Sequence, residues 1–388
     1  MAEANESGWR VPAAAALLKI AIHLPVIGRY GYHHDELYFL ACGRHLSFGY
    51  VDHPPLIPWI ARLMDELFGR WLFALRLPAV LAGAAAVFVT GMLVRRLGGG
   101  RLAQWIACLG MLVVPAYLRP AAMLTIVAFE PLIWVTSAYL LVRIADDEDR
   151  RLWVALGLVV GVGLLIKHST LFLGVGIAAS VLLTPMRRHL LSPWPWAGGM
   201  LALFLFLPNL LWQVEHGWPT VEFLRGLNAR VAPHVNPVIF AAGQLIYMNP
   251  VTVPVWIAGL LWLFGENGRR YRALGWIWIA AFTLLATAGG KVYYLAAAYP
   301  PLFAAGAVAF ERRRTRAESR ATPRRRWLLP RPLNALLVGG LFVLPASLPI
   351  LPIDATERYI GTLTFGLLEK AYEVTGDLHG QFGWRERV

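Results

Sequence analysis

The sequence has few charged residues for its length. Of its 388 residues, 15% are Asp, Glu, Lys or Arg, whereas 57% are hydrophobic. A soluble globular chain carries about 25% charged residues, so this chain has too few to cover a surface that faces water. The composition therefore excludes two or three large soluble domains and indicates an integral membrane protein.

Cysteine and lysine are also scarce. The two cysteines, Cys42 and Cys108, provide neither a disulfide framework nor a zinc-binding quartet. Only 4 of the 36 basic residues are lysine. The sequence also lacks a phosphate-binding glycine loop, a dinucleotide-binding fingerprint and a nucleophile elbow. The corresponding classes of soluble enzyme are therefore not indicated.

Long apolar runs dominate what remains. A hydrocarbon core of ~30 Å needs about 20 apolar residues per helix, and the sequence contains eleven such segments. They are 11–28, 71–94, 102–118, 125–142, 152–166, 170–186, 194–214, 238–264, 273–288, 292–310 and 333–353. The pair 152–166 and 170–186 is also compatible with one long helix. The sequence thus predicts an all-α membrane protein of about eleven spans.

The placement of basic residues predicts the orientation of the chain. With a cytoplasmic N-terminus, the inner loops contain 63 residues with 21 Lys and Arg, and the outer segments contain 112 residues with 13. This bias follows the positive-inside rule. We therefore expect the basic run 312–326 to contact anionic membrane lipid rather than nucleic acid. The first span is expected to stay as a signal anchor, and the loop 29–70 to lie on the outer face.

Titratable residues gather on the predicted outer face. Eight of the ten histidines lie in the outer segments. Within the spans the acidic residue is Glu130, which the segment boundaries place about a turn and a half into the span 125–142. A charged group at that depth costs free energy and usually serves function. We expect Glu130 to bind substrate, or alternatively to form hydrogen bonds to a neighbouring helix.

The first outer motif is the segment 32–39, YHHDELYF. Asp35 and Glu36 open an apolar stretch, 37–48, that is expected to form an interfacial helix. Asp35 suits the N-terminus of that helix, where carboxylates are favoured by free N–H groups and the helix dipole. It also suits the role of a general base close to the membrane surface. The two interpretations are compatible, because a capping position fixes a side chain well.

Three further outer elements carry polar side chains. The segment 49–56, GYVDHPPL, is either a rigid turn or part of a site. Lys291 either extends its ammonium to the membrane surface from a helix end or binds a phosphate. The aromatic residues of 209–219 either form a belt at the membrane interface or contact substrate. Including the first motif, the candidate substrate-binding residues are His34, Asp52, His53, Glu130, Lys167, His168, Trp212, His216, Lys291, Tyr293 and Tyr294.

Taken together, these segments resemble one family. The resemblance runs in order from about residue 30 to 310 and covers the bacterial branch of glycosyltransferase family 39, which includes protein O-mannosyltransferases and the lipid A aminoarabinose transferase. It is carried by HHDELYF, GYVDHPPL, a carboxylate in the fourth span, KHSTLF, WQVEHGWP and GGKVYYLAAAYPPLFAAGA. It implies the all-helical membrane-embedded GT-C fold. It also implies a sugar donor carried on polyprenyl phosphate and a reaction at the outer face of the bacterial cytoplasmic membrane.

The resemblance also implies roles for single residues. Asp35 matches the catalytic carboxylate and Glu36 its neighbour, while Asp52 matches the acidic position of the second motif. His53 stands where relatives have Lys, and Glu130 replaces the usual Asp. The expected reaction is an inverting transfer of a hexose or pentose to a hydroxyl group of a protein, lipid or glycan.

Family members commonly continue into a soluble outer domain. We therefore expect 1–353 to be the transmembrane catalytic domain, and 354–388 to be a short outer segment that is the start of a shortened or truncated soluble domain. A divalent metal ion (Mg²⁺, Mn²⁺ or Zn²⁺) is a candidate cofactor, with Asp35, Asp52 and Glu130 as its expected ligands.

Two other classes of protein stay as alternatives. They are a secondary transporter or flippase of envelope precursors, and a scaffold for envelope assembly. Transporters tend to have repeated halves and polar sites at the midplane of the membrane. In this sequence no halves repeat, and the polar residues lie at the outer boundary. The sequence therefore favours the transferase.

Overall fold

The computed structural model describes residues 8–69, 71–147, 149–231, 236–318 and 331–364. In these ranges every regular element is a helix, as predicted. The α-helices are α1 (Arg10–His23), α2 (His34–Arg44), α3 (Leu56–Phe68), α4 (Leu72–Arg96), α5 (Arg101–Leu112), α6 (Pro115–Leu118), α7 (Glu130–Asp147), α8 (Leu152–Ile166), α9 (Thr170–Leu182), α10 (Pro193–Glu215), α11 (Pro219–Val231), α12 (Pro237–Tyr247), α13 (Val253–Phe264), α14 (Arg272–Thr287), α15 (Pro300–Glu318), α16 (Arg331–Ser347) and α17 (Ile353–Leu363). Short 3₁₀ helices include η1 (Pro120–Ala122), η2 (Ile126–Ala128), η3 (Pro185–Leu191), η5 (Pro250–Thr252), η6 (Glu266–Tyr271) and η7 (Val292–Ala298).

The number of membrane spans differs from the prediction. Within the described ranges three helical segments are long and apolar enough to cross a membrane: α4, Ile126–Asp146 and α10. Four bent pairs would raise this number to seven if each pair is one span. The predicted count of eleven spans is therefore not confirmed, although the all-helical membrane class is.

Proline explains why the apolar runs bend. In each bent pair the second segment begins with proline, at Pro115, Pro185, Pro250 and Pro300, and the bend angles are 78°, 100°, 91° and 58°. Proline removes a backbone donor and pushes the preceding residue out of the helical region. A plot of hydropathy along the sequence does not reveal these bends. The single span predicted for 238–264 is therefore two helices, α12 and α13, that meet at 91°.

Two predicted boundaries are settled by the structure. The segment 152–186 forms two helices rather than one, because α8 ends at Ile166 and Lys167 adopts an extended backbone before α9 begins. Glu130 is the first residue of α7, and the helical segment that could cross the membrane begins at Ile126, so Glu130 lies about one turn inside that segment. Pro131 follows it, and the residue before a proline rarely continues a helix.

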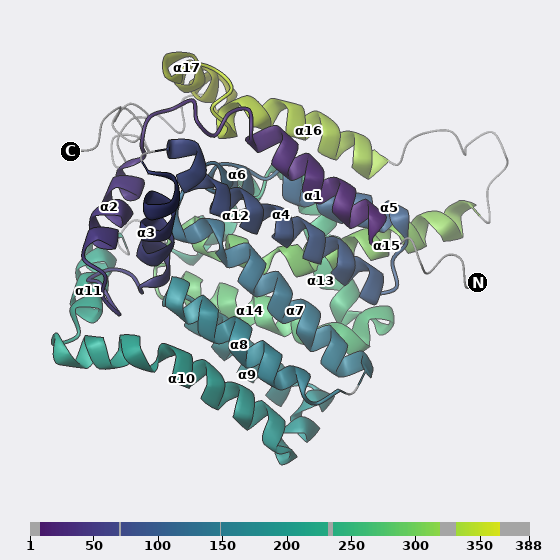
Figure 1. Cartoon of the computed structure of the whole chain (residues 1–388). Coiled ribbons are helices and arrows are strands. Elements are labelled where there is room, and N and C mark those ends of the chain that lie inside the picture. Colours follow the sequence, from purple (N-terminus) through teal and green to yellow (C-terminus); the bar gives the residue numbers. More distant parts are fainter. Residues whose placement is uncertain (1–7, 70, 148, 232–235, 319–330, 365–388) are drawn as a thin grey trace.

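The short helices gather at one end of the bundle. Figure 1 shows α2 and α3 side by side at the left of the view, next to α11, whereas α16 and α17 run along the upper edge. The predicted interfacial helix 37–48 corresponds to α2. Since α2 follows the first helix directly, the motif that contains Asp35 lies at this end. Of the predicted outer segment 354–388, residues 365–388 lie outside the described ranges.

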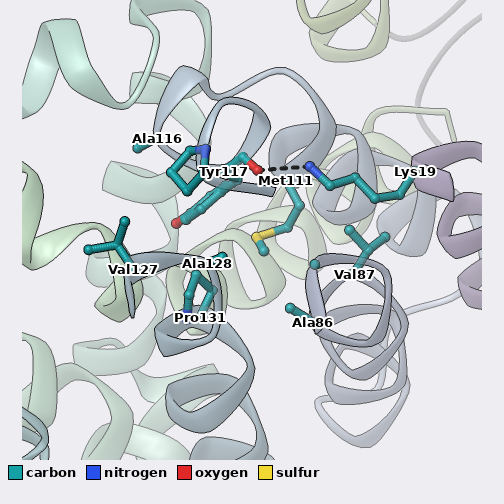
Figure 2. A pocket seen from close by; sticks show the side chains of 11 residues that line it. Lys19, Ala86, Val87, Met111, Ala116, Tyr117, Val127, Ala128 and Pro131 are labelled. Carbon is teal, nitrogen blue, oxygen red and sulfur yellow. Dashed lines mark hydrogen bonds between the residues drawn. The ribbon is translucent and has the colours of Figure 1, made fainter. Parts of the chain in front are cut away.

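Polar side chains support the bend between α5 and α6. The Lys19 ammonium on α1 donates to the carbonyl of Tyr117 at 2.8 Å, and a ring nitrogen of His23 lies 3.1 Å from the carbonyl oxygen of Leu118. Carbonyls at a helix end have no partner within the helix, and in lipid they need one from the protein. Figure 2 shows Lys19 reaching the Tyr117 carbonyl beside a cavity of about 10 Å³, about the space of one water molecule.

Glycines bring two helix pairs into backbone contact. A Cβ atom on Gly198 of α10 would lie 2.2 Å from the carbonyl oxygen of Trp153 on α8, and one on Gly306 of α15 would lie 1.8 Å from that of Val255 on α13. Small residues at such interfaces let helices approach closely in membranes, where dispersion contacts drive association. The adjacent Gly199 has no heavy atom within 4 Å of its Cβ position.

This difference predicts opposite outcomes for neighbouring substitutions. Gly198→Val should lower the free energy of unfolding by about 1–3 kcal/mol or more, because the new side chain overpacks the α8–α10 contact. Gly199→Val is the matched control, since it has the same helix-propensity change on an open face. Thermal unfolding of the detergent-solubilised variants measures both. Equal thermal midpoints for the two variants would contradict the close packing of α8 against α10.

Candidate active site

Asp35 lies in the first turn of α2, where the helix start holds its backbone. The neutral ring of His33 accepts a hydrogen bond from the Asp35 N–H at 3.2 Å, and the Glu36 carboxylate accepts one from the His33 N–H at 2.8 Å. Burial lowers the pKa of His33 to about 3, so its Nδ1 lone pair stays available. His33 and Glu36 thus form the capping box, and the Asp35 side chain is left half-exposed with His34 3.1 Å away.

Glu36 is fully buried, and its two carboxylate oxygens accept hydrogen bonds from several donors. The Arg76 guanidinium donates to both oxygens, at 2.8 and 2.7 Å, and the N–H groups of His33 and Leu124 donate at 2.8 and 2.9 Å. A carboxylate held by four donors is poorly placed to exchange a proton with substrate. The geometry therefore favours a structural role for Glu36, in which it binds Arg76 and two backbone N–H groups, over the catalytic role expected beside Asp35.

The electrostatic environment of Asp35 identifies its neighbours. Burial raises the pKa of Asp35; His34 and Lys291 act in the opposite direction, and the Asp52 and Glu36 carboxylates add to the rise. Carboxylates of raised pKa are better bases than ordinary ones. Lys291 and Asp52 therefore lie within electrostatic range of Asp35. Lys291 does so although it is more than 250 positions away along the chain.

The second motif forms a compact hydrogen-bonded unit. The Tyr38 hydroxyl donates to Asp52 at 2.5 Å, and the buried His53 ring packs among Tyr38, Phe39 and Tyr50. His53 Nδ1 lies 2.9 Å from the Pro54 carbonyl oxygen, which only accepts, so Nδ1 carries the proton. Burial lowers the pKa of His53. A neutral imidazole supplies no positive charge, so His53 does not replace the phosphate-binding lysine expected from the resemblance.

Glu130 has the partners that its burial requires. Its two oxygens accept from the Lys167 ammonium at 2.9 Å and from the Ser169 hydroxyl at 2.8 Å. The Lys167 ammonium also lies 4.2 Å from the centroid of the Tyr294 ring. This arrangement joins the start of α7 to the turn between α8 and α9. The Lys167 ammonium is therefore ion-paired with Glu130, which disfavours its use as a phosphate ligand.

Tyr293 connects the two acidic groups. It lies within electrostatic range of both Asp35 and Glu130, and its ring centroid is 4.9 Å from that of Tyr294 and 6.4 Å from that of Tyr247. Lys291, two residues earlier, is half-buried at the start of η7. Asp35 and Glu130 thus both lie within electrostatic range of Tyr293, and Asp52 and Lys291 lie within electrostatic range of Asp35.

Three predicted residues surround the second motif instead. His168 lies 3.1 Å from the side-chain oxygen of Asn209, whose amide donates to the Phe48 carbonyl at 2.8 Å. Trp212 packs so closely on Gly49 that a Cβ there would lie 2.3 Å from its ring. His216 stacks on Trp212 with ring centroids 4.2 Å apart and is exposed. These contacts favour a supporting role for His168, Trp212 and His216.

The expected metal ligands do not form one ligand set. Among the residues that the structure describes, the group close enough to hold a metal ion is His33, His34 and Asp35. Asp52 is bonded to Tyr38, and both oxygens of Glu130 already have donors. A ligand set built from Asp35, Asp52 and Glu130 therefore does not fit a metal ion.

Three residues that are not among the predicted site residues complete this site. Arg76 holds Glu36, Tyr38 holds Asp52, and Ser169 holds Glu130. Arg76 and Lys19 are the two basic residues within the eleven predicted spans, so counting basic residues inside spans would have singled them out. The small cavity beside Lys19 and a second one beside Arg119 are lined by none of the predicted site residues.

Part of the sequence is similar to known proteins. The sequence model of the dolichyl-phosphate-mannose-protein mannosyltransferase family matches residues 52–212. The chain is 27% identical over 263 residues to the lipid A galacturonosyltransferase RgtD of Rhizobium johnstonii, a match that covers 63% of this chain and 52% of RgtD. The chain thus spans about half the length of this curated relative.

Solved structures share the fold. The structure of ArnT from Cupriavidus metallidurans bound to undecaprenyl phosphate matches with a TM-score of 0.67 and 16% identity, over 96% of this chain and 73% of ArnT. The archaeal oligosaccharyltransferase AglB from Archaeoglobus fulgidus matches with a TM-score of 0.55 and 14% identity, over 86% of this chain and 54% of AglB. The chain thus has the all-helical GT-C fold of these solved structures, and its residues 52–212 resemble the mannosyltransferase family.

Proposed function

We propose that this protein transfers a sugar from a polyprenyl-phosphate donor to an acceptor hydroxyl, with inversion at the anomeric carbon. The observation that carries the proposal is the proximity of a half-exposed carboxylate of raised pKa, Asp35, to the ammonium of Lys291. These two groups match the two needs of the reaction, a base for the acceptor and positive charge for the leaving phosphate. The sugar is a hexose or pentose, and the acceptor belongs to a protein, lipid or glycan.

The proposed chemistry is a single displacement. Asp35 accepts the proton of the acceptor hydroxyl while the acceptor oxygen bonds to the anomeric carbon. The bond between that carbon and the phosphate oxygen breaks, and the negative charge that develops on the phosphate is stabilised by Lys291. Tyr293 and Tyr294 supply hydroxyl donors beside this path. Attack opposite to the leaving group inverts the anomeric carbon.

The relatives support a lipid-phosphate donor. ArnT was solved with undecaprenyl phosphate and AglB with a dolichol-phosphate, and RgtD acts on lipid A. Analysis by mass spectrometry of the lipid-linked sugars in a strain that lacks this gene tests the proposal. A polyprenyl-phosphate sugar should accumulate there and disappear when the gene is restored. An unchanged lipid-linked sugar pool would contradict the proposed donor.

Asp35→Asn should abolish the transfer, because the amide cannot accept the proton. The donor should still accumulate in cells that carry this variant, and purified protein should still bind undecaprenyl phosphate. Glu66→Gln, at an exposed carboxylate on the neighbouring α3, is the matched control and should restore normal lipids. Turnover by Asp35→Asn within threefold of wild type would reject Asp35 as the base.

Lys291→Met should lower kcat/KM at least tenfold, which is about 1.4 kcal/mol of transition-state stabilisation. Lys291→Arg should recover only part of the loss, because a planar fork replaces a compact point charge. Arg44→Met, which removes an exposed cation from the end of α2, is the control and should leave kcat/KM unchanged. An unaltered kcat/KM for Lys291→Met would make Lys291 a membrane anchor only.

The proposed site faces outward from the bacterial cytoplasmic membrane, on the basis of the basic bias of the opposite loops. We expect a cysteine at His45, in a variant without Cys42, to react with a membrane-impermeant thiol reagent in intact cells. A cysteine at Arg151 should react only after permeabilisation. Both positions are exposed. The reverse pattern of labelling would overturn the orientation and the outer-face reaction.

A further inference from the structure

We propose that Arg76 is a positioning residue for Asp35 and acts through Glu36. The inference rests on the proposed function, in which Asp35 is the base. Arg76 lies in the first turns of α4 and is not part of any motif singled out from the sequence. Its side chain is 1% exposed and that of Glu36 is 0% exposed, so neither contacts substrate.

The Arg76 guanidinium holds the connection between α1 and α2. Two of its nitrogens donate to the two oxygens of Glu36. The same group also donates to the backbone carbonyls of Ile27, Tyr30 and Gly31, with Gly31 at 2.7 Å and Tyr30 at 3.4 Å. One planar fork thus fixes the chain immediately before the capping box and the residue immediately after Asp35.

Glu36 extends this network to a third segment. Besides Arg76, it accepts from the N–H of His33 and from the N–H of Leu124. Leu124 follows η1, in the broken stretch whose carbonyls Lys19 and His23 support from α1. Asp35 is therefore held between two anchored neighbours, while its own carboxylate stays outside the network.

A buried ion pair is not by itself a source of stability. The cost of desolvating both charges often equals their attraction, so well-packed apolar residues are frequently as stable. Removing one partner is different, because it leaves an unpaired charge in a low dielectric. Fixing a unique local geometry is the better-supported use of such a pair, and here that geometry is the presentation of Asp35.

Catalysis depends strongly on such placement. A general base must come within about 2.6–3.2 Å of the proton that it accepts, and a displacement of about 1 Å can cost on the order of 10²-fold in rate. Loosening the α1–α2 connection should therefore lower kcat. It should change the KM for the lipid donor little, because Lys291 and the tyrosines of η7 are on other segments.

The test compares three variants. Arg76→Lys keeps the charge but loses the fork. Glu36→Gln combined with Arg76→Met removes both charges, so no unpaired buried charge remains and folding should be largely recovered. Gln104→Met is the matched control, because it removes a buried side chain that donates to the carbonyls of Gly8 and Gly91, at the opposite end of α4 from Arg76. Kinetics with the polyprenyl-phosphate sugar identified in the deletion strain are measured with thermal unfolding and hydrogen exchange of the peptide 27–36.

We expect kcat to fall at least tenfold in Arg76→Lys and in the double variant, with the donor KM within threefold of wild type. Exchange of peptide 27–36 should become at least tenfold faster, while Gln104→Met keeps wild-type kcat. A folded double variant with kcat within threefold of wild type would overturn the inference. Should Asp35→Asn be active as well, the proposed base itself is wrong, so the two failures are distinguishable.

Discussion

Charge that is buried in this protein must find a partner inside it. Glu36 is satisfied by Arg76 and by two backbone N–H groups, and Glu130 is satisfied by Lys167 and Ser169. An unpaired charge at such positions would cost several kcal/mol. These pairings fix the start of α2, the start of α7 and the turn between α8 and α9.

The same constraint governs the broken helices. Each proline bend frees backbone carbonyls within the apolar part of the chain, where irregular backbone is tolerated only when the protein satisfies it. Polar side chains from other segments do so: Lys19 at Tyr117, Asn249 at Val113 and Gln244 at Val292, with distances of 2.8 to 2.9 Å. Asn249 itself has a positive φ of 61° at one of the bends. The bends thus place η7 and the segment before α7 beside the first outer loop.

The residues around Asp35 differ in their exposure to solvent. Asp35 is half-exposed and Lys291 half-buried, whereas Glu36, Arg76 and His53 are enclosed. His53 stands at the position of the lysine expected from the family resemblance, and as a neutral ring among aromatic side chains it fills space rather than supplying charge. The positive charge near Asp35 then has to come from elsewhere in the cluster, and Lys291 is the ammonium within its electrostatic range.

The sequence by itself determined the class of the protein and most of the residues that meet at the site. Composition, apolar runs and the position of titratable residues depend on local chemistry, so they predict an all-helical membrane protein whose polar groups gather on one side. Bends and pairings were decided only by the tertiary structure. A proline in an apolar run leaves the hydropathy unchanged, so 238–264 resembles one span although it is two helices. Whether Glu36 meets substrate or Arg76 depends on a contact between residues 40 positions apart, and the energy of that contact exists only once folding has removed both side chains from water.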